Sequence, residues 1–186
     1  MLKYNKRNLV LSEMAICLVI SLVLKYEFVL FKMLNGGSVT LELVPIIIFC
    51  LRNKFKFGIL LIIIKEFFKI LVNFHIPPAA NVGYIILSIL LDYFLSNFCI
   101  LLIYFFNKFL KNNISIILSL LAKFIIHFIS GILIWNSYEI SIKNSLKISF
   151  FYNISYSFPE ICIIILVLKY SCILDFLEKT KIKRSD

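Results

Sequence analysis

Six apolar runs separated by short polar stretches dominate the sequence and restrict the folds open to it. They cover residues 9–24, 41–51, 57–72, 83–106, 114–135 and 148–170. A membrane-spanning helix needs about 20 mostly apolar residues, and the longer runs reach that length. A hydrophobic content of 61% and a mean hydropathy of +0.98 exclude a water-soluble domain. The sequence therefore predicts an all-α, polytopic integral membrane protein, with residues 1–186 forming one six-helix domain in the cell membrane.

The lysine and arginine residues predict how this domain is oriented. Twelve lie in the N-terminus, loops two and four and the C-terminal tail, namely Lys3, Lys6, Arg7, Arg52, Lys54, Lys56, Lys108, Lys111, Lys179, Lys181, Lys183 and Arg184. Loops one, three and five hold four, namely Lys25, Lys32, Lys143 and Lys147. Because cytoplasmic loops carry an excess of basic residues, both termini are predicted to be cytoplasmic. The net charge of +10 fits such loops better than a nucleic-acid-binding surface.

Several function classes lack the residues they require. The five cysteines, Cys17, Cys50, Cys99, Cys162 and Cys172, lie in apolar runs without CxxC or Cys/His ligand spacing, so they indicate neither a metal site nor a disulfide framework. No paired nucleophile and base, HExxH motif or phosphate-binding glycine-rich loop with a lysine is visible. We therefore expect no catalysis, no ATP hydrolysis and no cofactor.

The fifth run carries an unusual polar stripe. Lys123, His127, Gly131 and Trp135 follow one another at four-residue steps, which at about 100° per residue places them along one side of a helix. Taken singly, the lysine could snorkel, the histidine could bond between helices and the tryptophan could sit at the membrane interface. Taken together, beside a glycine that opens space, they favour a helix side that lines a cavity.

The fourth and sixth runs contain the other polar residues that need an explanation. Asp92, followed by Tyr93, lies in the middle of the fourth run, where a carboxylate is costly without a partner or a ligand. A pairing of Asp92 with Lys123 is one structural explanation. In the sixth run Asn153, Tyr156 and Glu160 share a helix face. A negative charge, aromatic faces and hydrogen-bonding groups together suit a flat aromatic cation with an amino group and a hydroxyl.

Three segments resemble one family. KFIIHFISGILIW followed by NSY resembles the fifth membrane helix of the thiamine-specific substrate-binding (S) component of energy-coupling factor transporters, with the same Lys, His, Gly and Trp spacing. GGSVTLELVPI is similar to the family's segment leading into helix two, and FYNISYSFPE to its sixth helix around a ligand-binding asparagine. The resemblance implies that the protein binds thiamine and works with a membrane coupling subunit and two cytoplasmic ATPases.

The resemblance also implies roles for individual residues. The acidic residue before the tyrosine of helix four, here Asp92, would recognise the aminopyrimidine of thiamine. Ile148 stands where the family often has a tyrosine, and Tyr152 could supply that contact. In helix one the family presents an Ala-x-x-x-Ala surface to the coupling subunit, which here corresponds to Ala15 and Val19.

The remaining polar residues receive structural interpretations. Glu42 is either a solvated interfacial carboxylate or part of a cation site. Glu66 can pair with Lys69 near the membrane surface. His75, before a Pro-Pro pair, is expected to be a solvated loop residue. Residues 136–147 are expected to form a loop.

Two further functions stay open from the sequence. One is an S component for a different vitamin, because ligand choice depends on few residues. The other is a structural or assembly protein in which polar residues only hold helices together. An intramembrane enzyme has the least support, because no catalytic set is visible.

Overall fold

The computed structural model describes residues 6–33, 36–79, 81–136, 139 and 141–170. Asn35 of the first loop, Tyr138, Cys172 and the basic tail from Lys179 to Arg184 lie outside the described residues. The elements, in order, are α1 (Lys6–Tyr26), β1 (Phe31–Lys32), β2 (Ser38–Val39), α2 (Leu43–Arg52), α3 (Phe55–Val72), α4 (Val82–Ser88), η1 (Ile89–Leu95), α5 (Ser96–Phe98), η2 (Cys99–Leu102), α6 (Ile103–Phe106), α7 (Asn112–Ser130), η3 (Gly131–Trp135) and α8 (Ile142–Tyr170).

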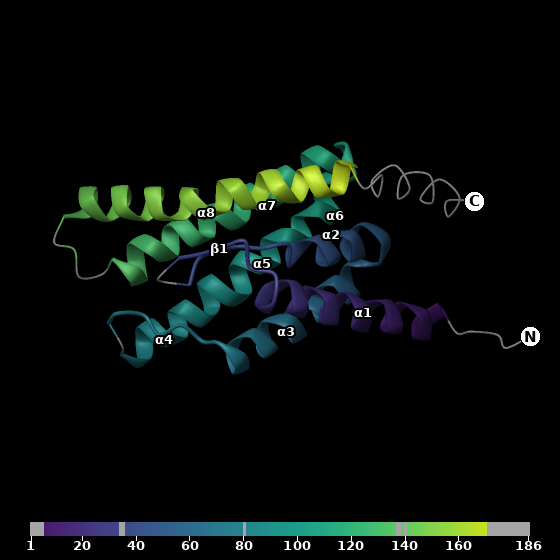
Figure 1. Ribbon diagram of the computed structural model, residues 1–186, viewed down its shortest axis with the longest axis horizontal. Coiled ribbons are helices and arrows are strands. Elements are labelled where there is room, and N and C mark those ends of the chain that lie inside the picture. Colours follow the sequence, from purple (N-terminus) through teal and green to yellow (C-terminus); the bar gives the residue numbers. More distant parts are fainter. Residues whose placement is uncertain (1–5, 34–35, 80, 137–138, 140, 171–186) are drawn as a thin grey trace, which may run out of the picture.

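The described residues form a bundle of six helical segments (Figure 1), when α4 to α6 are counted as one continuous segment and η3 as the continuation of α7. Within the described residues four segments are long and apolar enough to cross a membrane, namely Lys6–Tyr26, Val82–Phe106, Asn112–Trp135 and Ile142–Tyr170. The predicted all-α membrane class is confirmed. In the described chain the only strands are β1 and β2, which pair antiparallel with Phe31 opposite Val39.

Helix α2 lies at the centre of the core. Seven of its ten residues are buried, among them Leu43, Ile47 and Phe49. They pack with Leu61 of α3 and with buried isoleucines and leucines of η2, α7 and α8. A helix of ten residues is about 15 Å long, half the thickness of a bilayer core. Burial on all sides explains why this short helix is apolar around its whole circumference.

The last helix starts earlier than the sequence suggests. The other helical segments begin and end within three residues of the predicted runs, but α8 begins at Ile142 and not at residue 148, so half of the expected 136–147 loop is helical. The first turns of α8 are mostly exposed, and Ser145 is buried and donates to the carbonyl of Asn136 at 3.3 Å. A polar, exposed stretch of helix carries no apolar signal, which explains the error.

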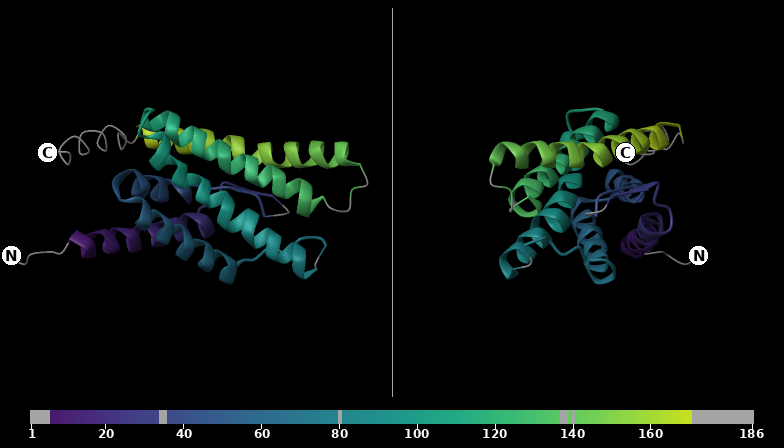
Figure 2. Two further views of the ribbon diagram at one scale, coloured as in Figure 1. Left: turned by 180° about the vertical axis from the view of Figure 1, so that it is seen from behind. Right: turned by 60° about the vertical axis from the view of Figure 1, so that its left-hand side comes forward.

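The first and the last described helix place the two ends of the described chain at the same end of the bundle. The start of α1 and the end of α8 are at the same end, whereas α4 and the first turns of α8 are at the opposite end (Figures 1 and 2). In α1 the buried side holds Cys17 and Ser21, and Ser21 Oγ donates to the carbonyl of Glu42 at 2.8 Å. Ala15 and Val19 are on its exposed side. This packing orients the last turn of α1 toward the strands.

Candidate ligand-binding site

A cavity of about 230 Å³ opens between the helices at the end away from the start of α1. Its wall comes from the last turns of α1 and α3, the loop after α3, the β1–β2 turn, Glu42 before α2, η1, the second half of α7 with η3, and the first two thirds of α8. Typical ligand pockets measure about 300–1,000 Å³, and this cavity lies just below that range, which suits a small ligand.

The four residues of the fifth-run stripe, Lys123, His127, Gly131 and Trp135, all line this cavity. The backbone helps to keep them aligned, because α7 passes at Gly131 into a wider π-helical turn in which the N–H of Asn136 donates to the carbonyl of Gly131 at 3.0 Å. In such a turn each residue advances less than in an α-helix, which keeps Trp135 on the side of Gly131. A second π-helical turn, η1, contains Asp92 and Tyr93.

Asp92 is the centre of a hydrogen-bond network between η1 and α7–η3. Its Oδ2 accepts from Trp135 Nε1 at 2.9 Å and from Ser88 Oγ at 3.4 Å, and its Oδ1 lies 3.3 Å from His127 Nδ1. The Asp92 side chain is 14% exposed and, among the described residues, has no lysine or arginine within ion-pair distance. An ionised carboxylate has about four acceptor positions, so at least one remains for a ligand.

The contact with Asp92 also determines which ring nitrogen of a neutral His127 carries the proton. Because the carboxylate only accepts, Nδ1 of a neutral His127 must carry the proton, and Nε2 is then an acceptor. Asp92 and His127 thus present two hydrogen-bond acceptors to the cavity, with the indole ring beside them. This arrangement suits a ligand with an amino group on an aromatic ring.

The α8 wall is aromatic and internally bonded. Tyr156 donates to Asn153 Oδ1 at 2.7 Å, and Asn153 Nδ2 donates to the carbonyl of Ser149 at 2.9 Å. The Tyr152 hydroxyl accepts from the N–H of Gly37 at 3.2 Å, which ties the β1–β2 turn to α8. A Cβ on Gly37 would lie 2.7 Å from the Tyr156 ring, so only glycine allows this approach. The exposed Ile148 also lines the cavity.

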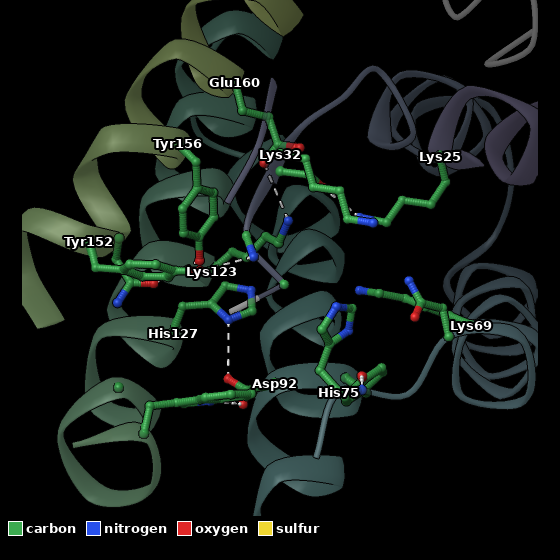
Figure 3. A pocket seen from close by; sticks show the side chains of 18 of the residues that line it. Lys25, Lys32, Lys69, His75, Asp92, Lys123, His127, Tyr152, Tyr156 and Glu160 are labelled. Atoms are coloured by element: carbon green, nitrogen blue, oxygen red, sulfur yellow. Dashed lines mark hydrogen bonds and ion pairs between the residues drawn. The ribbon is translucent and has the colours of Figure 1, made fainter. Parts of the chain in front are cut away.

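Lys123 does not pair with Asp92, so that structural explanation of Asp92 is wrong. The ammonium of Lys123 lies 3.5 Å from Glu160 Oε2, and the other oxygen of Glu160 accepts from Thr40 Oγ1 at 3.4 Å (Figure 3). The sequence could not distinguish the two partners, because both carboxylates lie at membrane depth on other helices. Asp92 therefore has no lysine or arginine partner among the described residues.

Glu42 is not a solvated carboxylate, since it is 2% exposed. Its two oxygens lie 3.5 Å from Lys25 and 3.3 Å from Lys65, so α2 is linked to both α1 and α3. Lys65 also lies 2.8 Å from Glu66, which in turn pairs with Lys69 at 3.6 Å. The predicted Glu66–Lys69 pair is present, and Glu66 is fully buried within the bundle.

Sequence reasoning missed four basic residues of the described cavity wall, namely Lys25, Lys32, Lys69 and His75. His75 is half-buried, its ring packs against Gly36 of the first loop, and its N–H donates to the Tyr93 hydroxyl at 3.0 Å. It is therefore not a freely solvated loop residue. Burial lowers the pKa of His75, and the nearby lysines, first among them Lys32, lower it further. No sequence signal distinguishes these residues from loop charges.

The comparison with protein families decides the assignment. The profile of the thiamine transporter protein family (Thia_YuaJ) matches residues 11–179. The chain belongs to the thiamine transporter family. Its fold is also similar to the solved structure of ThiT from Listeria monocytogenes, with a TM-score of 0.64 and 19% identity over 91% of this chain and 98% of that chain. Among the curated proteins compared with the chain, none matches significantly.

The presence of a cavity for a small ligand agrees with membership of the thiamine transporter family. The resemblance noted from the sequence is confirmed at the level of the family, and with it the functions of transport and thiamine recognition. The acceptor pair of Asp92 and His127, the indole of Trp135 and the tyrosine wall of α8 all line this one cavity.

Proposed function

We propose that the chain is the substrate-binding subunit of an energy-coupling factor transporter and that the cavity holds thiamine. The observation that carries this proposal is the acceptor pair formed by Asp92 and His127 beside Trp135. The aminopyrimidine of thiamine has an amino group that can donate to both acceptors. Its hydrogen bond to Asp92 is charge-assisted and so about twice as strong as a neutral one.

The rest of the ligand has matching surfaces. The thiazolium ring is a delocalised cation, and an indole or phenol face near it contributes about 0.5–2 kcal/mol. Trp135 and Tyr156 offer such faces, and Asn153 holds the Tyr156 hydroxyl in place. Gly131 lets η3 pack closely against α8 beside the cavity, and Tyr93 lies on the η1 side. In this proposal Lys123 and Glu42 act through their ion pairs, which shape the wall.

The proposed orientation places the cavity on the external side. The first loop and the end of η3 would then face outside, and the six helical segments would lie in the membrane with both termini in the cytoplasm. The shared end of α1 and α8, opposite the cavity, supports this arrangement. No ATPase motif is visible in the sequence, so transport would need a membrane coupling subunit and two cytoplasmic ATPases. The exposed side of α1 around Ala15 and Val19 is the proposed contact with the coupling subunit.

A fluorescence titration tests the proposal. Trp135 is the only tryptophan of the sequence and lines the cavity, so a bound aromatic cation should quench its emission. We expect saturable quenching by thiamine at one ligand per protein, which riboflavin, biotin and pyridoxine do not compete away. Saturable binding of another vitamin with no binding of thiamine would contradict the proposed substrate. No binding of any vitamin by folded protein would favour a structural role.

A further inference from the structure

A second hollow lies between α3 and the segment from α5 to α6, and it shares no lining residue with the ligand cavity. Its volume is about 350 Å³, and the described residues that line it are all apolar, namely Phe55, Ile59, Phe98, Leu101, Leu102 and Phe105. The four from the α5–α6 segment follow the i, i+3, i+4, i+7 spacing of one helix face, and the two from α3 are one turn apart. We call this hollow the α3–α6 groove.

The groove has a packed floor and an exposed rim. Leu101 is 6% exposed, whereas Phe55 and Phe105 are 40% and 52% exposed. A Cβ on Gly58 would lie 2.7 Å from the Tyr104 hydroxyl and 3.1 Å from Leu101 Cδ2, so α3 and the α5–α6 segment approach closely under the groove. The groove therefore lies between two packed segments and opens to the outside of the bundle.

The outside of the bundle is lipid, because the chain belongs to a family of membrane transporters. A water in the groove would find no polar side chain to bond, whereas an acyl chain is apolar and narrow. The helix face from Phe98 to Phe105 is about 10 Å long, a third of the hydrocarbon core, so it takes part of one chain. Lipid tails are as apolar as leucine, so the groove alone cannot prefer one lipid to another. Any preference must come from the headgroup.

One end of the groove is basic. The rings of Phe55 and Phe105 meet there edge to face with their centroids 5.8 Å apart, and Lys108 Nζ lies 5.9 Å from the centre of the Phe105 ring. Lys56, which follows Phe55, and Lys108 are both exposed, and among the described residues neither has a carboxylate within ion-pair distance. Residues 52–58 and 106–113 contain no aspartate or glutamate. The apolar groove thus leads to two ammonium groups without an anion.

We propose that the α3–α6 groove binds an anionic phospholipid, with one acyl chain in the groove and the headgroup phosphate held by Lys56 and Lys108. Basic pockets between membrane helices suit anionic headgroups, and an ammonium forms charge-assisted hydrogen bonds to phosphate oxygens. The groove positions the chain, and the lysines select its charge. The site is separate from the proposed thiamine site, because α6 and the end of α8 lie at the end of the bundle away from the cavity (Figure 1).

Native mass spectrometry of the full chain tests the headgroup contact. The protein is released from nanodiscs of equal phosphatidylglycerol and phosphatidylcholine with identical acyl chains, and the retained lipids are counted by mass. We expect the parent to retain phosphatidylglycerol about 5-fold or more over phosphatidylcholine, since one lysine near an anionic lipid contributes about 5-fold. The double variant Lys56→Met, Lys108→Met should retain the two lipids equally. The matched control is Lys143→Met, Lys147→Met, which removes two exposed lysines of α8 outside the groove and should keep the preference.

Two variants that fill the groove test the position of the acyl chain. Leu102→Trp places an indole in the groove from a half-buried position, and it should lose the retained phosphatidylglycerol. Ile59→Phe fills the groove from the opposite wall and should do the same, so the test does not depend on one variant folding. Leu121→Trp, on an exposed position of α7 outside the groove, is the control and should retain lipid like the parent. Circular dichroism shows which variants are folded.

The proposal is overturned if the parent retains the two lipids equally. It is also overturned if the Lys143, Lys147 variant loses the preference as much as the Lys56, Lys108 variant, because positive charge anywhere on the protein would then explain it. Unchanged retention in folded Leu102→Trp and Ile59→Phe would show that the chain lies elsewhere. A parent dimer that these two variants dissociate, with lipid retention unchanged, would identify a second copy as the occupant and exclude the lipid.

Discussion

Gly131 of η3 packs tightly against Ser149 and Asn153 of α8 beside the cavity, and this contact offers a quantitative test. A Cβ added there would collide with Ser149 Oγ and would lie 3.0 Å from Ser149 Cβ and 3.1 Å from Asn153 Nδ2. Ser149 cannot turn away freely, because its Oγ donates to the Phe128 carbonyl at 2.7 Å. Overpacking a close contact costs about 1–3 kcal/mol, and a lost hydrogen bond about 0.5–1.5 kcal/mol. Gly131→Ala should therefore lower the free energy of unfolding by about 1–3 kcal/mol and weaken thiamine binding.

The assay is denaturant unfolding of the purified variants together with a thiamine titration. Gly83→Ala is the matched control, because a Cβ there would meet only Asn81 Oδ1 at 3.4 Å, and helix propensity alone should leave stability unchanged or raise it by up to about 1 kcal/mol. Ser149→Gly removes both colliding atoms, but it also removes the bond to Phe128 and places a glycine inside α8, so it should destabilise the parent and cost clearly less in the Gly131→Ala background. The reasoning is refuted if Gly131→Ala behaves like Gly83→Ala, or if Ser149→Gly costs as much in the Gly131→Ala background as in the parent.

Three further predictions concern the ligand, the fold and the orientation. Trp135→Ala should weaken thiamine binding by about 0.5–2 kcal/mol through the lost aromatic face, with Trp135→Phe in between; equal affinities by calorimetry would contradict the stacked pose. His75 has a lowered pKa in the folded state, so its contribution to stability is present above its unfolded pKa of about 6.5 and is lost as the pH falls through the lower folded value. The melting temperature of the parent should accordingly fall more between pH 7.5 and pH 5 than that of His75→Gln, and parallel curves would count against it. In a background without the native cysteines, a cysteine at Ser141 should react with an impermeant thiol reagent outside intact cells and one at Asn113 should not; the reverse pattern would invert the proposed topology.

The polar residues of η1 and of α7–η3 could be predicted as site residues from the sequence, because a polar side chain at membrane depth is energetically costly. Asp92, His127 and Trp135 each stand in an apolar run, where a polar group needs a partner or a ligand, and the structure brings all three into one network. Lys123 shows the limit of this reasoning. The sequence shows that burying the Lys123 ammonium is costly. It does not show which carboxylate pairs with Lys123, because Glu160 comes from another helix and only the packing of α7 on α8 brings the two together.

The basic side of the cavity could not be predicted for a related reason. Lys25 and Lys69 stand near helix ends, where lysines usually reach the membrane surface, so the sequence gives them an ordinary explanation. Their inward direction depends on Glu42 and Glu66, which the packing of α2 on α1 and α3 buries. The π-helical turns at Asp92 and Gly131 likewise have no signature in the residue pattern, although such turns are frequent at functional sites.

The central claim is that the Asp92 carboxylate recognises the ligand, and its most direct test is Asp92→Asn. The substitution keeps the shape and removes the charge. A charge-assisted hydrogen bond contributes about 1.5–3 kcal/mol, which corresponds to a loss of at least 10-fold in affinity. Calorimetric titration with thiamine should show that loss in Asp92→Asn, with a melting temperature close to that of the parent because no buried lysine depends on Asp92 in the described structure. An unchanged thiamine affinity, together with a lower melting temperature, would show that Asp92 stabilises the helices and does not bind the ligand.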